Sequence, residues 1–240
     1  MKLQHAFSKL TGAAAMLSCP IGLASIILVF NAFNWDFETA FDPLKAIAYQ
    51  PDPSPALRWG WSLDILGYYL LLAPAVIYLH NWLSLKAPLH SQLFAFFGLG
   101  YILTGAVGAA VLAGTSQPLF AAYATGDPTQ QVAVAQIYAS TVHAVMDGIW
   151  NLFSMLMGAI WWLGTGWLLR SERKWLAMLF TTIGVASLVD VFGTAFQNEL
   201  VSTLGLNIYL WFAPLGALWL GVIVWRRTLL SSPSPAIATT

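Results

Sequence analysis

Apolar stretches long enough to cross a membrane alternate along the chain with shorter polar segments. There are six of them, at 10–33, 59–83, 93–112, 142–169, 176–196 and 204–225. A bilayer core of about 30 Å needs about 20 residues of α-helix, and helices satisfy their own backbone N–H and C=O groups where water is absent. The pattern predicts an all-α membrane bundle: a single domain at 1–230 with six transmembrane helices, followed by a disordered tail at 231–240.

Basic residues are unevenly distributed among the segments that join these spans. With the amino terminus in the cytoplasm, the cytoplasmic segments hold eight: Lys2, Lys9, Lys86, Arg170, Arg173, Lys174, Arg226 and Arg227. The external segments hold only Lys45 and Arg58. Cytoplasmic loops carry the excess of Lys and Arg in membrane proteins, so we expect both termini to be cytoplasmic. The composition resembles that of many bacterial six-helix membrane proteins, and the expected location is the plasma membrane.

Two external loops are predicted to be substantial. The loop at 34–58 begins with Trp35-Asp36-Phe37-Glu38, which is expected to form a short helix on the membrane surface. The loop at 116–131 contains Gly126-Asp127-Pro128, a turn that starts the next helix. The helical pattern from 129 to 170 spans about 60 Å at 1.5 Å per residue. This exceeds one crossing, so the fourth helix should project outward or break near Ser140.

Composition supports this placement in a lipid bilayer. Of the 240 residues, 58% are hydrophobic and only 8% are charged, whereas a soluble domain carries about 25% charged residues. The twelve Trp and eight Tyr are side chains that favour the membrane–water interface. The net charge of zero argues against nucleic acid as a partner.

Three carboxylates occur inside the predicted spans, where each ionisable residue is a candidate functional group. They are Asp64, Asp147 and Asp190. Counting from the interfacial Trp residues at 1.5 Å per residue places Asp64 and Asp190 about 8 Å below the outer surface and Asp147 near the outer boundary. All three are therefore expected in the outer third of the membrane.

Each carboxylate belongs to a polar stripe at helical spacing. His143, Asp147 and Asn151 follow one another every four residues, as do Asp64 and Tyr68, and Asp190 shares a face with Gln197. The stripes predict an outward-facing polar pocket that binds or transports a small ligand or ion. Its candidate ligand or proton-pathway residues are Asp64, Tyr68, His143, Asp147, Asn151, Asp190 and Gln197.

Two other readings remain open at this point. Polar side chains also join membrane helices, so the chain is alternatively a non-catalytic accessory or assembly subunit of a membrane complex. A third hypothesis is an intramembrane enzyme with His143 and Asp147 as an acid/base pair. The chain has only four His and no His-Glu-x-x-His, glycine-rich phosphate loop or Gly-x-Ser-x-Gly sequence. A non-enzyme is therefore favoured, no metal site is predicted, and no cofactor is identified.

The third span is rich in small residues at four-residue spacing. Gly105 with Ala109 and Ala110 with Gly114 are such pairs. Small residues allow helix backbones to approach closely, either inside a bundle or between chains. Packing within the bundle is the favoured use, and contact with a second copy or a membrane-complex partner is the alternative.

Overall fold

The computed structural model describes residues 2–227, and within this range the chain is helical apart from short connections, without a strand. Six segments are long and apolar enough to cross a membrane, which confirms the predicted all-α class and the number of candidate spans. The predicted tail at 231–240 lies outside the described residues. The elements in order are α1 (Lys2–Asn31), α2 (Phe37–Phe41), α3 (Pro43–Ile47), α4 (Ser54–Asp64), η1 (Ile65–Tyr69), η2 (Leu70–Leu72), α5 (Ala73–Leu83), α6 (Pro88–Thr125), α7 (Pro128–His143), η3 (Ala144–Ser154), α8 (Met155–Leu169), α9 (Lys174–Ala195) and α10 (Glu199–Arg227).

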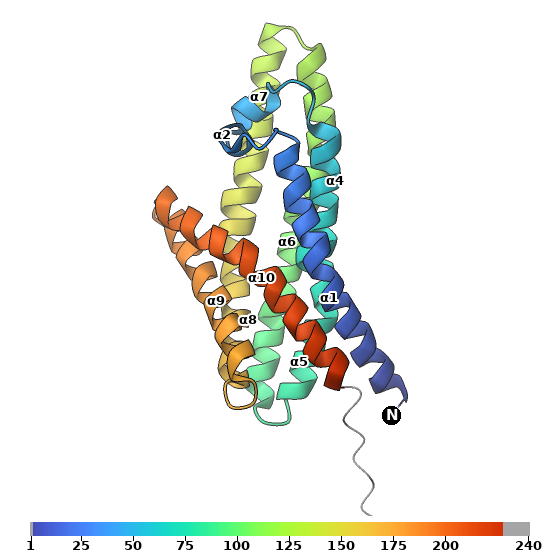
Figure 1. The fold of residues 1–240 in the computed structure, drawn as a ribbon. Helices are drawn as coiled ribbons and strands as arrows, with labels where there is room; N and C mark the ends of the chain where they lie inside the picture. Colours follow the sequence, from blue (N-terminus) through green and yellow to red (C-terminus); the bar gives the residue numbers. More distant parts are fainter. Residues whose placement is uncertain (1, 228–240) are drawn as a thin grey trace, which may run out of the picture.

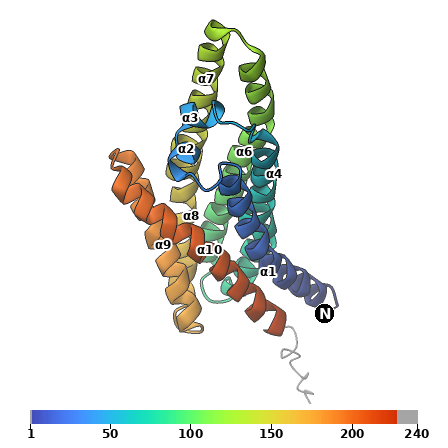
Figure 2. The same cartoon turned by 45° about the horizontal axis from the view of Figure 1, so that its top comes forward.

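The long helices run up and down between two ends of the molecule. The start of α1, the end of α10 and the α5–α6 and α8–α9 connections lie at one end (Figure 1). The α6–α7 hairpin rises at the other end, above α2 and α3, while the tip of the α9–α10 hairpin leans away from the rest of the bundle (Figure 2). The upper part of α10 is therefore separated from α1, although the two helices cross further down.

The predicted external loop at 116–131 is wrong, because α6 continues as a helix to Thr125 and α7 begins at Pro128. The predicted turn and helix start are confirmed: the Asp127 side chain accepts from the backbone of Gln130, whose side chain bonds back to Asp127 N–H. At 1.5 Å per residue, the 38 residues of α6 extend about 57 Å. Both α6 and the segment that follows it are longer than one crossing, as the sequence predicts for the fourth helix.

Two of the spans are not regular α-helices. The second one changes to a π-helix at η1 and to a 3-10 turn at η2 before α5 begins. Pro74 has no N–H to offer the Leu70 carbonyl, which instead accepts from Ala73 N–H. The fourth span does not break at Ser140 but widens into the π-helix η3, eleven residues long. Both irregular segments lie in the middle part of their spans.

Backbone carbonyls in the irregular stretch accept hydrogen bonds from hydroxyl groups of other helices. The Ser18 hydroxyl of α1 donates to Gly67 O at 2.6 Å. The Tyr101 hydroxyl of α6 donates to Tyr68 O at 3.2 Å. A chain in hydrocarbon must satisfy such groups internally, so these bonds hold the interrupted span against α1 and α6.

A proline in α10 creates a similar requirement. Pro214 has no N–H, which leaves the Leu210 carbonyl without its helical partner. The Tyr68 hydroxyl donates to this carbonyl at 2.8 Å. The bond connects the second span to α10 at the level where α10 begins to lean outward.

Most buried side chains belong to one cluster that α5, α6, α8, α9 and α10 share. Its largest fully buried members are Trp161, Trp162, Tyr101, Phe180, Leu79 and Ile183. A second, smaller cluster lies under the short helices and contains Phe33, Ile47, Leu57, Phe120 and Tyr138. The second cluster packs α3 against α1, α4, α6 and α7. It therefore fixes the short helices α2 and α3, which cover the upper end of the bundle.

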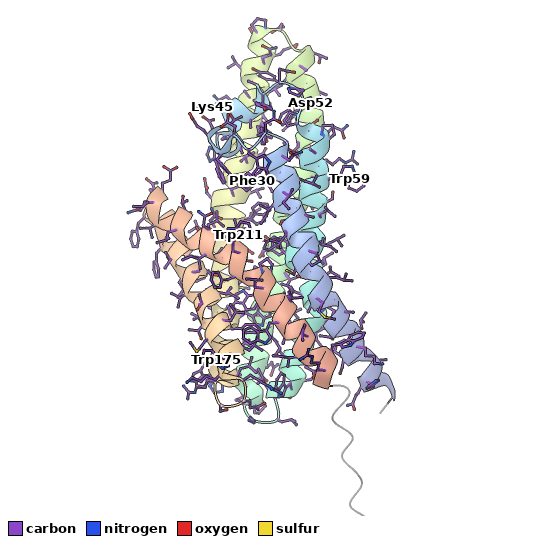
Figure 3. The ribbon with its side chains drawn as sticks, in the orientation of Figure 1. Phe30, Lys45, Asp52, Trp59, Trp175 and Trp211 are labelled. Carbon is purple, nitrogen blue, oxygen red and sulfur yellow. The ribbon has the colours of Figure 1, made fainter. Side chains whose placement is uncertain are left out.

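The short helices that form this cover are capped by acidic side chains. The Asp36 carboxylate accepts from the hydroxyl and the N–H of Thr39 at 2.7 and 3.2 Å. These donors hold the pKa of the Asp36 carboxyl below its usual value, so this cap is present at neutral pH and is lost as the pH falls through the lowered pKa. Lys45, labelled in Figure 3, pairs with Glu38 across the two helices. A short helix is present in this loop as predicted, although it begins at Phe37 and not at Trp35.

The small residues of α6 pack mainly against side chains of the same chain. A Cβ added at Gly98 would meet the Trp161 ring, and one at Gly108 would meet the Trp150 ring. One at Gly105 would overlap the Tyr69 ring. Only the upper part of the small-residue run, with Ala110 and Gly114, is exposed. Packing within the bundle therefore accounts for most of it.

Gly105→Ala should destabilise the protein, whereas Gly114→Ala on the same helix should not. The buried Tyr69 ring would have to move to admit a Cβ at Gly105, and overpacking of this kind costs on the order of 1–3 kcal/mol. The space around Gly114 is open, so alanine there gains helix propensity. Thermal unfolding in detergent measures both variants, and equal unfolding temperatures would contradict the packing described here.

Candidate functional site

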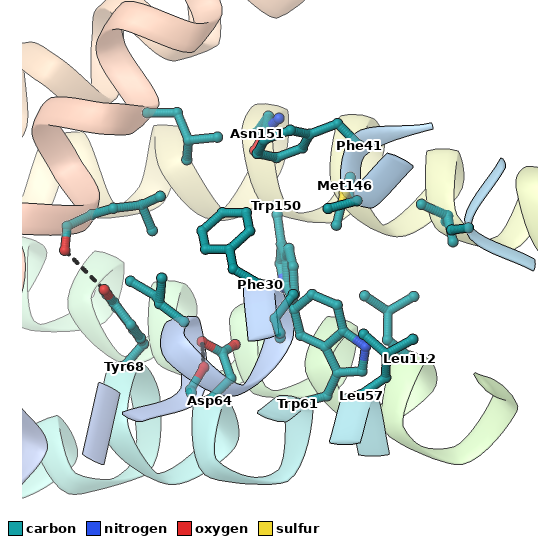
Figure 4. A pocket seen from close by; sticks show the side chains of 18 of the residues that line it. Phe30, Phe41, Leu57, Trp61, Asp64, Tyr68, Leu112, Met146, Trp150 and Asn151 are labelled. Atoms are coloured by element: carbon teal, nitrogen blue, oxygen red, sulfur yellow. Dashed lines mark hydrogen bonds between the residues drawn. The ribbon is translucent and has the colours of Figure 1, made fainter. Parts of the chain in front are cut away.

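A cavity lies beneath the short helices, between α1, the second span, η3 and the upper part of α10. Its volume is about 140 Å³. Aromatic rings form much of its wall, with Phe30 and Phe41 on one side and Trp61 and Trp150 on another (Figure 4). An apolar cavity with a few polar groups is the usual form of a small-molecule site.

The aromatic wall is held in place by packing and by a hydrogen bond. The Trp61 and Trp150 rings lie 5.6 Å apart, centroid to centroid. Trp150 Nε1–H donates to Gly105 O at 3.0 Å, which fixes the indole against α6. On the opposite wall the Phe30 ring packs edge-on against Phe41, with the centroids 5.8 Å apart. The cavity is therefore largely preformed.

Asp64 is the one acidic side chain that lines the cavity. It is 8% exposed, and its Oδ1 accepts a long hydrogen bond of 3.4 Å from the Ser25 hydroxyl. Its buried Oδ2 has no hydrogen-bond partner among the described residues. Figure 4 shows the carboxylate on the cavity side of α4, below Phe30 and beside Trp61. A buried carboxylate oxygen without a partner is energetically unfavourable in an apolar surrounding.

Tyrosine hydroxyls occupy the lower end of the cavity. Tyr68 donates to the Leu210 carbonyl, and the Tyr101 hydroxyl, just below, bonds to that of Tyr209. The rings pack closely, since Tyr69 lies 5.5 Å from Tyr101 between centroids. These tyrosines shape the floor of the cavity, and among the described lining residues Asp64 Oδ2 is the side-chain oxygen that is buried without a partner.

The structure brings three of the seven candidate residues to this cavity: Asp64, Tyr68 and Asn151. His143 and Asp147 form a pair at 3.0 Å with side chains 62% and 57% exposed, and neither lines the cavity. The predicted polar stripe of the fourth span is thus divided. Asn151 faces the cavity, while His143 and Asp147 face outward.

The remaining two candidates belong to the α9–α10 hairpin. Asp190 is fully buried and accepts a hydrogen bond of 2.6 Å from the Ser202 hydroxyl. Gln197 is exposed and ends α9 in a left-handed conformation, with φ 55°. The next residue, Asn198, donates its N–H to Gly193 O at 2.7 Å, which closes the helix end. Asp190 therefore joins two helices, and Gln197 forms a turn.

Sequence reasoning based on polar stripes missed the aromatic residues that form most of the cavity wall. Trp61 and Trp150 fall at the outer level of their spans, where a Trp is ordinarily assigned to the interface. Ser25, whose hydroxyl donates to Asp64, is an isolated polar residue in the apolar second half of α1. The available signal was the number of aromatic residues near the Asp64 level, and it does not reveal which of them face inward.

The donor set at Asp64 does not resemble a metal site. Hard cations such as Ca²⁺ and Mg²⁺ take six or more oxygen ligands, and Asp64 has only the Ser25 hydroxyl within hydrogen-bond distance. Among residues 2–227, no three His, Cys, Asp or Glu side chains are grouped as metal ligands. An organic ligand fits the aromatic wall better.

Comparisons of the chain with protein-family models, with curated proteins and with solved structures find no match. The six apolar helices indicate a membrane protein. Beyond that class, any function has to be argued from the geometry of the cavity and from the buried carboxylates.

Ser202→Ala should lower stability, because it leaves the buried Asp190 carboxylate without its closest donor. Loss of a partner for a buried polar group costs on the order of 1–3 kcal/mol. Thr203→Ala removes an exposed hydroxyl from the next residue of the same helix and should leave stability nearly unchanged. Thermal unfolding of both variants tests this, and a harmless Ser202→Ala would mean that Asp190 does not join α9 to α10.

Proposed function

We propose that the protein is a multi-pass membrane protein with both termini in the cytoplasm. Exposed basic side chains support this orientation, because Lys86, Arg170 and Lys174 all lie at the end of the bundle where α1 begins and α10 ends. Trp175 at this end and Trp59 on α4 are 66% and 67% exposed and point away from the bundle (Figure 3). Exposed Trp at two levels is typical of the two membrane interfaces.

In this orientation the cavity lies in the outer half of the membrane. Asp64 precedes the end of α5 at Leu83 by nineteen residues, or about 28 Å at helical rise. The bilayer core is about 30 Å thick. The cover formed by α2 and α3 then lies at the outer interface, where it separates the cavity from the external solution.

The function that the geometry supports best is the binding of a small, mainly apolar molecule in this cavity. The observation that carries the proposal is the unpartnered Asp64 oxygen in a preformed aromatic cavity of about 140 Å³. An apolar protein cavity of roughly 150 Å³ is known to accept benzene, so the size fits a ligand with one aromatic ring. The unpartnered oxygen provides a polar anchor that a packed core would not need.

The enzyme hypothesis has less support. His143 and Asp147 have the separation of an acid/base pair, but both side chains are more than half exposed. No wall encloses a substrate beside them, and the cavity does not include them. The accessory-subunit hypothesis predicts no saturable ligand binding, so the same binding experiment tests it.

A neutral probe of the right size tests the cavity itself. We expect 2-phenylethanol to bind saturably to the protein in phosphatidylcholine nanodiscs, with a dissociation constant on the order of millimolar for its nine heavy atoms. Val142→Trp fills the cavity, because Val142 lines it, and should weaken binding at least about tenfold. Titration by saturation-transfer NMR, with empty nanodiscs subtracted, measures the affinity.

Val185→Trp is the matched control, since Val185 is 49% exposed on α9 and does not line the cavity. This variant should bind the probe as the parent does. An absence of saturable binding to the parent would contradict a ligand cavity and would favour the accessory role.

Orientation is tested by thiol labelling in intact cells. In a Cys19→Ser background, Asp127→Cys at the α6–α7 turn should react with an impermeant maleimide. Ser171→Cys, in the exposed α8–α9 connection, should react only after permeabilisation. The reverse labelling pattern would place the termini outside.

A further inference from the structure

The buried carboxylate of Asp64 lacks a compensating cation within the chain. None of the residues that line the cavity is Lys, Arg or His. The ion pairs among the described residues do not include Asp64: Lys45 pairs in the α2–α3 cover, Lys86 pairs with Glu172 at the opposite end, and His143 pairs with Asp147 outside the cavity. An ionised carboxylate buried without a partner is strongly destabilising, and a bound cation would supply the counter-charge that the lining residues lack.

The surroundings of Asp64 suit one kind of cation. The Trp61 and Trp150 rings face the same cavity, and their indoles are the best aromatic partners for a cation within about 6 Å. A metal ion would find too few oxygen ligands beside the Ser25 hydroxyl. An ammonium group attached to carbon matches both parts of the site, because its charge pairs with the carboxylate while its apolar part contacts the rings.

Asp190 shows that burial alone does not create such a site. It is as deeply buried as Asp64 and also has one oxygen without a partner. However, it does not line the Asp64 cavity, and the backbone of α10 at Gly205 packs directly against the backbone of α9 at Asp190. Asp64 therefore differs from Asp190 in the open space and the aromatic rings on its unpartnered side.

We propose that the cavity selects small aromatic or aliphatic organic amines, with Asp64 as the counter-ion of the ammonium group and the tryptophan rings as its cage. This inference rests on the proposed function, since it uses the same cavity. It adds the charge and the chemical class of the ligand. Neutral molecules of the same shape bind more weakly, and anions are excluded.

A matched set of probes tests the selection. They are 2-phenylethylamine, 2-phenylethanol and 3-phenylpropanoate, which share a phenyl ring on a short chain and carry a positive charge, no charge and a negative charge. In phosphatidylcholine nanodiscs at neutral pH, the amine should bind the parent about tenfold or more tightly than the alcohol. The anion should show no saturable binding.

The Asp64→Asn variant should lose this preference, because the amide keeps the shape of the side chain and removes its charge. Its ratio of alcohol to amine dissociation constants should fall to about one, with binding of the alcohol retained. Asp147→Asn removes a carboxylate outside the cavity and should keep the parent ratio. Trp61→Leu should reduce the ratio severalfold while Asp64 is still present.

Each outcome decides one of the two proposals. If the parent binds the alcohol and the amine equally, amine selection is wrong. If Asp64→Asn retains the preference, Asp64 is not the counter-ion and the inference is wrong. The ligand cavity stands in both cases. If the parent binds none of the three probes, the proposed function falls and the inference falls with it. The comparison of probes on the parent needs no variant, so a poorly folding Asp64→Asn does not prevent the test.

Discussion

A backbone carbonyl that loses its helical partner inside a membrane must find another donor, and this requirement organises the upper half of the bundle. Tyr68 takes part in two hydrogen bonds of this kind. Its carbonyl accepts from the Tyr101 hydroxyl, and its own hydroxyl donates to Leu210 O, which Pro214 leaves free. One residue thus connects the second span to α6 and α10. Because Tyr68 follows Asp64 by about one turn, the same bonds fix the carboxylate at the lower edge of the cavity.

The cavity is formed where the spans depart from regular α-helix. η1 contributes Tyr68 and Tyr69 to its wall, and η3 contributes Met146, Trp150 and Asn151. A π-helix is wider than an α-helix and is often found at functional sites. The cover of α2 and α3 lies over the upper side. The cavity is therefore enclosed between the irregular helices and this cover.

Hydropathy predicted the class and the six spans because lipid exposure determines composition over about twenty residues at a time. It could not predict the end of α6, where residues 115–125 are polar enough to read as a loop although they form a helix. The candidate site was predicted in part, because the face of the fourth span that turns inward is mainly apolar. Val142, Met146 and Trp150, each one residue before a member of the polar stripe, line the cavity. Asn151 borders the same cavity, whereas the Asp147 side chain is 57% exposed.

Buried acidic residues in a membrane protein are either joints between helices or parts of a site, and depth does not separate the two. Asp64 and Asp190 were both expected in the outer third, and both are buried with one oxygen unpartnered. The two residues differ in how closely the surrounding helices pack. Around Asp190 the helices approach so closely that a Cβ at Gly193 or Gly205 would overlap the backbone of the opposing helix, which is the geometry of a joint. Around Asp64 there is open space bounded by rings. A joint is stable as it stands, whereas open apolar space beside a carboxylate leaves room for a bound molecule that pairs with it.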